Sequence, residues 1–376
     1  MPHIDDRRRA GRGWVVRWRT SDGREHSKSF PLKTKAEDYL VSVGADLVRG
    51  DYVDPTAGKV QLNDWSARWF AVIRPTLKPS TVESYESLLR SRILPRFGTT
   101  RVGAIRPSDV QEWVARMTEE GLSPSRIRKC VVVLKMALDA AVRDGMIRSN
   151  PAVGTKQPRI ERVEAAYLTP EIVDELAAAM PTNEYRLLIQ VLGILGPRFG
   201  EAAGLTRQDV DFLRRRLHVR DSVTEVGGRL VRTATKSYAT RQLPLPPTLA
   251  ETLRVHLETV EKTVDAPIFR APSGGPLRYR AFHGRIWTPT LKRLGLPTVG
   301  LHVLRHSAAA RMISAGASAK AVQTVLGHRS AAFTLTVYGH LFDTDLDDLA
   351  ARLESPAGRS RDGLTVLSDA PLASSA

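Results

Sequence analysis

Four short stretches in the second half of this 376-residue chain carry side chains whose types and spacing could do chemistry on a phosphate. The stretches are "GPRFGEAAGL", "TATKSYATRQLPLP", "LHVLRHSAAARM" and "VLGHRSAAFTLTVYGHL". Their polar candidates are Arg198, Lys236, His302, Arg305, His328 and Tyr338. Each of them alone has an ordinary interpretation as an ion-pair partner, a solvated turn residue or a buried aromatic. Taken together and in this order, the six residues form a more specific pattern than any of them does alone.

The local sequence indicates how each candidate is positioned. Arg198 follows a Gly-Pro break at the expected start of a helix, where backbone N–H groups favour a phosphate. Lys236 lies in a turn between two strand-like runs, from which a long side chain can lean into a cleft. His302 and Arg305 are three residues apart, so on a helix they share one face.

A metal site is the alternative for the histidines. His302 and His306 have the spacing of the zinc motif H-E-x-x-H, but residue 303 is Val. The chain has a single cysteine, Cys130, so it can form neither a cysteine-rich zinc site nor a disulfide framework. We therefore expect no metal.

Composition favours a polyanionic partner. Lys and Arg total 56 against 40 Asp and Glu, a net charge of +16, and the sequence pI is about 10.3. Residues 59–164 are the most basic segment, with 19 basic and 11 acidic side chains. Nucleic acid is the expected partner, and a basic surface without a ligand is the alternative. No apolar run is long enough to span a membrane and no signal peptide is evident, so we expect a cytoplasmic protein.

The sequence divides into several segments, whose expected helices and strands would hold these residues in place. "WVVRWRTSDGREHSKSF" predicts a hairpin, and a helix follows it within residues 1–57. Residues 58–152 have helical periodicity throughout, and residues 153–165 are a linker. Residues 166–355 mix helices with short strands, beginning with a helix capped by Thr169. Residues 356–376 are expected to be disordered.

In this order, the candidates resemble the catalytic signature of the tyrosine recombinase (phage integrase) family, and the chain looks most like integrases of actinobacterial temperate phages. The resemblance extends over nearly the whole chain. Residues 1–57 resemble an arm-type DNA-binding sheet module, and residues 58–152, with "RDGMIRSNPA", resemble the helical core-binding (SAM-like) domain. Residues 166–355 resemble the mainly α (α+β) catalytic domain. The expected fold class is therefore multidomain, with a small N-terminal β-sheet plus helix module, an all-α domain and an α+β domain.

The resemblance implies a role for each candidate. Tyr338 would attack the phosphodiester and form a 3′-phosphotyrosyl bond, while the guanidinium groups of Arg198 and Arg305 hold the non-bridging oxygens. By the family's scheme Lys236 would protonate the departing 5′ oxygen, and His302 would assist proton transfer. His328 would hydrogen-bond the phosphate, Glu201 would support Arg198 structurally, and no cofactor would be required. One departure is Pro197, since the family usually has an apolar residue other than proline before the first arginine.

The implied function is site-specific recombination that integrates or excises a phage or mobile element. The implied partners are double-stranded DNA at crossover and arm-type attachment sites, a homotetramer on that DNA, an excisionase and a host DNA-bending protein. DNA contacts are expected from Arg17, Arg19, Arg24 and Lys28 in the sheet module and from Arg126, Arg128 and Lys129 in the helical domain. An apolar stripe of Leu346, Leu349, Ala350 and Leu353 would dock on a neighbouring protomer or pack on its own domain.

Three other functions remain open at this point. A chromosome-dimer-resolving housekeeping recombinase would share the catalytic residues but normally lacks the sheet module. A non-catalytic DNA-binding protein on the same fold would be expected to have lost some of the polar positions. A type IB topoisomerase shares the chemistry, and plasmid relaxation without strand exchange would reveal it.

Overall fold

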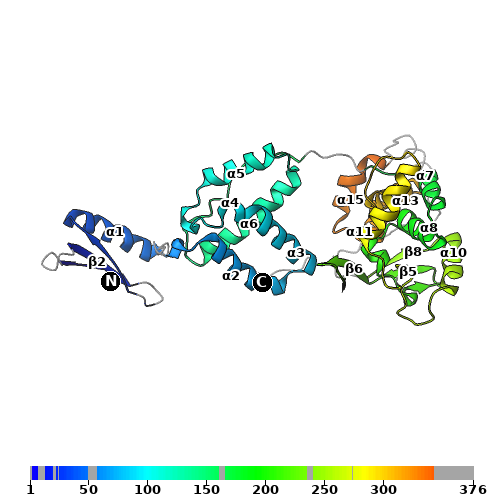
Figure 1. Ribbon diagram of the computed structural model, residues 1–376, viewed down its shortest axis with the longest axis horizontal. Helices are drawn as coiled ribbons and strands as arrows, with labels where there is room; N and C mark the ends of the chain where they lie inside the picture. The colour runs from blue at the N-terminus through cyan, green and yellow to red at the C-terminus, as the bar shows by residue number, and fades with distance from the viewer. Residues whose placement is uncertain are drawn as a thin grey trace, which may run out of the picture. The chain divides into compact units, whose positions relative to one another are not determined.

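The computed structural model describes residues 2–6, 13–19, 23, 25–49, 57–160, 166–234, 240–272 and 274–342 (Figure 1). The chain divides into two compact units, residues 1–163 with 225–231, and residues 164–224 with 232–376. Among the sequence predictions, Arg24, Lys236, the apolar stripe at 346–353 and the tail at 356–376 lie outside the described residues. No helix in the described ranges is long and apolar enough to span a membrane.

The first unit begins with a three-stranded antiparallel sheet in the order β1-β2-β3, formed by β1 (His3–Asp6), β2 (Trp14–Arg19) and β3 (Glu25–Phe30). The helix α1 (Lys33–Arg49) packs on it, with Val16, Trp18, Ala36 and Val43 in the shared core. The predicted hairpin is therefore β2 and β3. The sequence did not predict β1, because the run "HIDD" is short and half acidic.

Strand register divides the basic residues of this sheet between its two faces. Lys28 is paired with Val16, so it lies on the face that α1 covers, and its ammonium is 4.4 Å from the centre of the Tyr39 ring. Arg17 and Arg19 alternate with buried residues and point to the opposite face. Arg17 is also held in ion pairs within its own sheet, by Asp5 and Glu25.

A helical domain follows the sheet and α1 in the first unit. Its helices are α2 (Leu62–Ile73), α3 (Pro79–Leu88), α4 (Leu94–Phe97), α5 (Pro107–Glu119) and α6 (Pro124–Arg143). One apolar core joins them, and it includes Phe97, Trp113 and Leu134. Trp65 belongs to the same core and its Nε1–H donates to the carbonyl of Ala137 at 2.8 Å, so the indole is buried without an unpaired donor.

The basic cluster on α6 lies on the solvent side of that helix. Arg126, Arg128 and Lys129 are exposed, whereas Ile127 and Cys130 between them are buried. The helix predicted in this segment is therefore present and amphipathic, and three cations line one exposed edge of its first two turns.

The second unit is mainly helical with a small sheet. Its helices are α7 (Pro170–Ala178), α8 (Asn183–Gln190), α9 (Phe199–Ala203), α10 (Pro247–Glu258), α11 (Tyr279–Phe282), α12 (Thr288–Arg293), α13 (His302–Ser314), α14 (Ala319–Leu326) and α15 (Ala331–Tyr338). Strands β4 (Val210–Asp211), β5 (Arg216–Val219) and β8 (Arg241–Pro244) form an antiparallel sheet, and β6 (Asp221–Val226) pairs with β7 (Arg229–Ala234). Together with the first unit, this arrangement confirms the predicted fold class.

Helix α13 is the centre of the second unit. It packs against α7, α14 and the π-helical turn η6 (Val191–Leu195), and Figure 1 shows it beside α15. Small residues such as Ala308 and Ala309 are fully buried, which allows close approach of the neighbouring elements. Side chains cap the N-termini of two helices in this unit. Thr169 caps α7, as predicted, by accepting a hydrogen bond from the N–H of Ile172, and Ser330 caps α15 by accepting one from the N–H of Phe333.

Gly196 makes the turn that leads from η6 to Arg198. Its φ is +70°, and a Cβ at this position would lie 2.6 Å from Leu326 Cδ2 and 3.0 Å from Ala308 Cβ. Only glycine satisfies both the left-handed backbone and the close contact with α13 and α14.

We expect Gly196→Ala to lower the free energy of unfolding by about 2–5 kcal/mol. The left-handed backbone costs an L-residue about 1–2 kcal/mol, and the crowded methyl adds an overpacking cost of about 1–3 kcal/mol. Gly295→Ala is the matched control, because its φ is +68° and nothing lies within 4 Å of the added methyl. Urea unfolding measures the loss of stability in both variants. Equal losses would mean that crowding against Leu326 and Ala308 adds no cost.

Candidate active site

The buried carboxylate of Glu201 organises one side of the site. Arg198 is the N-cap residue of α9, and its backbone N–H donates to Glu201 Oε2 at 2.7 Å while its Nη1 donates to Oε1 at 2.8 Å. Arg241, the first residue of β8, donates to the same two oxygens at 3.1 and 2.6 Å. Glu201 is 1% exposed, so one carboxylate ties α9 to β8 and fixes the direction of Arg198.

The charges around Glu201 keep it ionised. Burial by itself would raise the pKa of this carboxyl, but the hydrogen bond and positive charge of Arg241, with those of Arg198, lower it from 4.5 to about 2. The carboxylate is therefore negative at any pH at which the protein would work. The Arg241 Nε–H also donates to the carbonyl of Val325 at 2.8 Å, which ties α14 to the same cluster.

Arg305 is the second guanidinium of the site and is 3% exposed. It projects from the first turn of α13, and its Nη1 donates to the carbonyl of Gly196 at 2.8 Å while Nη2 donates to the carbonyl of Leu326 at 2.5 Å. These acceptors are the C-terminal ends of η6 and α14. Burial, and then repulsion from Arg198, lowers the pKa of Arg305 to about 9. The cation is desolvated and close to another cation, so it would gain from a bound anion.

Tyr338 ends α15, and its side chain is 2% exposed. Its hydroxyl lies 2.7 Å from Nδ1 of His306. Burial raises the pKa of the phenol to about 12, although the charge of Arg305 acts in the opposite direction. The phenol is therefore protonated at neutral pH and needs an acceptor before it can act as a nucleophile.

Two histidines lie beside the tyrosine, and a third contacts one of them. The rings of His328 and Tyr338 are stacked with centres 6.2 Å apart, and His328 Nδ1 lies 2.9 Å from the Thr334 hydroxyl. The His302 and His306 rings meet edge to face at 4.9 Å. Burial first, and then the charge of Arg305, lowers the pKa of both His306 and His328, that of His328 to about 4. Both imidazoles are neutral at pH 7 and can accept hydrogen bonds.

The structure thus brings the described candidates into one cluster. The residues gathered there are Arg198, Glu201, His302, Arg305, His328 and Tyr338. Lys236 lies outside the described residues. Pro197 precedes Arg198 without displacing it from the N-cap position of α9.

Sequence reasoning missed two members of this cluster. Arg241 sits in "TRQLPLP" as an arginine on a short strand, and nothing in the sequence relates it to Glu201, 40 residues earlier. His306 was considered only as a possible metal ligand with His302, and not as a partner of the tyrosine. In both cases the sequence offered only a polar residue beside other polar residues, which is also typical of ordinary surface positions.

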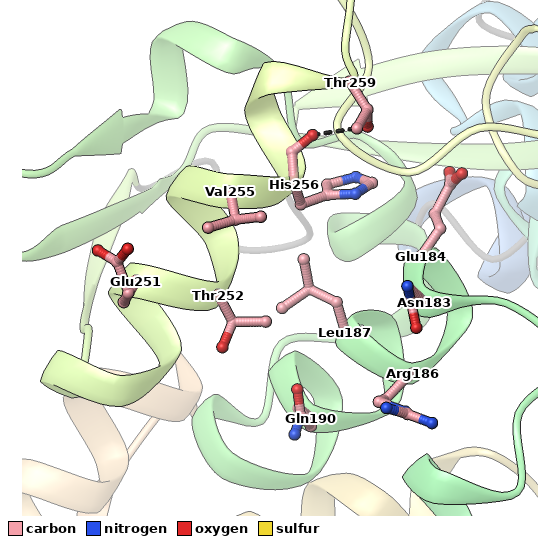
Figure 2. Close-up of a pocket in the computed structure, with 10 residues that line it drawn as sticks. All are labelled: Asn183, Glu184, Arg186, Leu187, Gln190, Glu251, Thr252, Val255, His256 and Thr259. Atoms are coloured by element: carbon pink, nitrogen blue, oxygen red, sulfur yellow. Dashed lines mark hydrogen bonds between the residues drawn. The ribbon is translucent and has the colours of Figure 1, made fainter.

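A separate hollow of about 480 Å³ lies between α8 and α10. In Figure 2, Leu187 of α8 faces Thr252 and Val255 of α10. None of the described catalytic candidates lines it, and its charged residues are Glu184, Glu251 and Arg186. It therefore lacks the excess positive charge that a phosphate requires. Within the described ranges, no group of His, Cys, Asp and Glu side chains could hold a metal ion.

Comparison with known proteins agrees with the geometry. The sequence pattern of the Phage integrase family matches residues 166–345, and that of the phage integrase N-terminal SAM-like domain matches residues 61–118. The integrase of Mycobacterium phage L5 is 30% identical over 283 residues, which cover 72% of this chain and 73% of that integrase. The chain belongs to the phage integrase family. The predicted resemblance to integrases of actinobacterial phages is confirmed.

Two solved structures illustrate the fold of this integrase-family chain. The Tn1549 transposon integrase in complex with a circular intermediate DNA superimposes with a TM-score of 0.66 at 24% identity, covering 78% of this chain and 99% of that one. A lambda integrase tetramer bound to a Holliday junction superimposes with a TM-score of 0.57 at 20% identity, covering 88% and 96%. These identities support the fold alone.

We expect Glu201→Gln to lower the free energy of unfolding at pH 7 by about 3–5 kcal/mol, because it leaves the charge of Arg241 buried without its partner. The stabilisation from the wild-type carboxylate is fully present above pH 4.5 and is lost as pH falls toward 2, so the variant should lose less stability over that interval.

Glu251→Gln provides the control for this substitution, since Glu251 pairs with Arg254 on the exposed face of α10 and should matter little. Urea unfolding at pH 7 and at pH 3.5 compares the three proteins. A Glu201→Gln protein as stable as the control at pH 7 would show that this ion pair does not hold the site together.

Proposed function

We propose that this chain is a site-specific DNA recombinase that cleaves and rejoins DNA through a 3′-phosphotyrosyl intermediate, and that it integrates or excises a phage or mobile element. The observation that carries the proposal is a buried cluster in which an excess of guanidinium groups lies beside a tyrosine hydroxyl. Family membership supports the same reaction.

The cluster favours a bound phosphodiester. Among the described residues, Arg198, Arg241 and Arg305 surround the single carboxylate of Glu201. Arg241 is fully engaged by that carboxylate, whereas the Arg198 side chain is 30% exposed and can contact a ligand. A phosphate oxygen at Arg198 and Arg305 would supply the missing negative charge, and two guanidinium groups can stabilise the charge that grows on it in the transition state.

In the proposed reaction, the Tyr338 oxygen attacks the phosphorus and the bond from phosphorus to the 5′ oxygen breaks. Lys236 would give that oxygen its proton, as the family's scheme implies. His328 would hydrogen-bond the phosphate and His302 would assist proton transfer. The phosphotyrosyl bond keeps the energy of the broken bond, so a 5′ hydroxyl can reverse the step on the same or another strand.

Two DNA segments would be bound by different parts of the chain. The helical domain, with Arg126, Arg128 and Lys129, and the catalytic domain would grip the crossover site, while Arg17 and Arg19 of the sheet module would read arm-type sites. Lys28 faces α1 and Tyr39, which makes it a weaker candidate for arm contacts than the two arginines. The presence of this sheet and α1 favours an integrase over a housekeeping recombinase.

We further propose that four protomers assemble on DNA. The lambda integrase structure is a tetramer bound to a Holliday junction, and four copies are the number needed to exchange two strand pairs. An excisionase and a host DNA-bending protein would set direction and bring arm and crossover sites together.

We expect Tyr338→Phe to bind crossover DNA normally but to form no covalent complex, because only the nucleophilic oxygen is removed. A nicked suicide substrate, from which the cleaved end diffuses away, should trap wild type as a slow band on a denaturing gel. An equal yield of that band from the Phe variant would remove Tyr338 from the reaction.

Arg198→Lys and Arg305→Lys should each slow cleavage by on the order of 100-fold or more, the usual effect of losing one donor to the developing anion. Lysine keeps the charge but loses the bidentate guanidinium geometry. Single-turnover cleavage of the same substrate measures the rates, with Arg254→Lys on exposed α10 as control. Wild-type kinetics in either site variant would contradict its assigned role.

Arg19→Ala and Arg128→Ala should have opposite effects on the two DNA segments. The first should weaken binding to arm-type DNA and leave binding to crossover DNA intact, and the second should do the reverse, because the residues lie on different modules. Footprinting of the attachment region by each variant tests this. A loss of crossover protection in Arg19→Ala would mean that the sheet does not act as a separate DNA-binding module.

A further inference from the structure

The hydroxyl of Tyr338 has a specific neighbour that the scheme above leaves unused. His306 follows Arg305 in the first turn of α13, and its Nδ1 lies 2.7 Å from the phenolic oxygen. Consecutive residues of a helix point about 100° apart around its axis. Arg305 therefore turns to the carbonyl groups of Gly196 and Leu326, and His306 turns to α15.

We propose that His306 accepts the proton of the Tyr338 hydroxyl when the tyrosine attacks DNA. This inference rests on the proposed function and adds to it a catalytic residue, since His306 contacts the reacting oxygen itself. The contact is already made without DNA, so no rearrangement is needed to bring acceptor and donor together.

The protonation states of the two groups suit this transfer. Burial raises the pKa of the phenol to about 12, so its proton is present and available to donate. Burial and the charge of Arg305 lower the pKa of His306, so the imidazole is neutral and Nδ1 has a free lone pair in the tautomer protonated at Nε2.

The neighbouring histidines are engaged differently. Nδ1 of His328 lies 2.9 Å from the hydroxyl of Thr334, and the His328 ring is stacked nearly parallel to Tyr338 with an interplanar angle of 14°. Stacking directs its ring face, and not a ring nitrogen, toward the tyrosine ring. His302 meets the His306 ring edge to face, with ring centres 4.9 Å apart.

The Tyr338 O–H bond breaks and its proton moves to His306 Nδ1, while the phenolic oxygen forms the bond to phosphorus. The bond from phosphorus to the 5′ oxygen breaks, and that oxygen takes a proton from Lys236. On rejoining, the 5′ hydroxyl attacks, its proton returns to Lys236, and the imidazolium of His306 returns its proton to the departing tyrosine oxygen. The phosphate held by the arginines offsets the charge of the imidazolium.

Two variants of His306 separate a proton acceptor from a residue that only positions the tyrosine. His306→Ala removes the contact, whereas His306→Asn keeps a hydrogen-bond acceptor near the position of Nδ1 but cannot take a proton. We expect both to bind crossover DNA and to cleave on the order of 100-fold or more slowly, the usual contribution of a general base. His256→Ala is the control, because that half-buried histidine bonds to the Ile268 carbonyl and lines the hollow in Figure 2.

A modified DNA substrate then shows whether a residue transfers a proton at the nucleophile or at the leaving group. With sulfur in place of the bridging 5′ oxygen, the leaving group needs no proton, so this substrate should restore fast cleavage to Lys236→Ala. It should not restore either His306 variant, because the defect lies at the nucleophile. Covalent complex formation in a single turnover is measured for every pair of protein and substrate.

The outcomes are distinguishable. If wild type forms no covalent complex with either substrate, the proposed function itself fails. If wild type reacts but His306→Asn cleaves at the wild-type rate, His306 only positions the tyrosine. If the sulfur substrate restores His306→Ala, the residue acts on the leaving group. Either of the last two results overturns the inference. Should His306→Ala unfold, His306→Asn alone decides.

Discussion

The ion pairs of Glu201 with Arg198 and Arg241 are the interaction on which the rest of the site depends. A carboxylate this deeply buried is unfavourable unless it is charge-compensated, and two arginines compensate it. The carboxylate fixes the start of α9 through Arg198 and the start of β8 through Arg241. The bond from Arg241 to the carbonyl of Val325 extends this to the end of α14. Arg305 then joins the end of α14 to the turn at Gly196. The frame that holds the site is therefore polar and closed on itself.

The same frame leaves an electrostatic imbalance that a DNA phosphate would relieve. Arg305 is desolvated and repelled by Arg198, which lowers its pKa to about 9. Its donors to Gly196 and Leu326 hold the guanidinium in place before any ligand arrives, so little reorganisation is needed when charge develops. Tyr338 lies in this field as a neutral phenol with an imidazole beside it. An excess of cations, a protonated phenol and a neutral imidazole are thus held together by one set of helix ends.

Much of this could be predicted from the sequence because it depends on local patterns. The hairpin at residues 14–30, the cap at Thr169 and the helical pattern of α6 follow from spacing and turn chemistry. The choice of Arg198, Arg305 and Tyr338 came from the resemblance of their order to the tyrosine recombinase signature. The partners of Glu201 and Tyr338 could not be predicted, because Arg241 and His306 meet them across 40 and 32 residues and only tertiary packing sets those contacts. The side of the sheet on which Lys28 lies depends on the register between β2 and β3, and the formation of β1 depends on its pairing with β2. Neither can be read from one segment of the sequence.

Held in this frame, Tyr338 is proposed to become covalently joined to DNA. The most direct measurement is mass spectrometry of the wild-type protein after reaction with a nicked suicide substrate and digestion with nuclease and protease. We expect one modified peptide, spanning "TLTVYGHL", with a nucleotide attached through phosphate to Tyr338. A nucleotide on any other side chain, or cleaved DNA without any protein adduct, would contradict it.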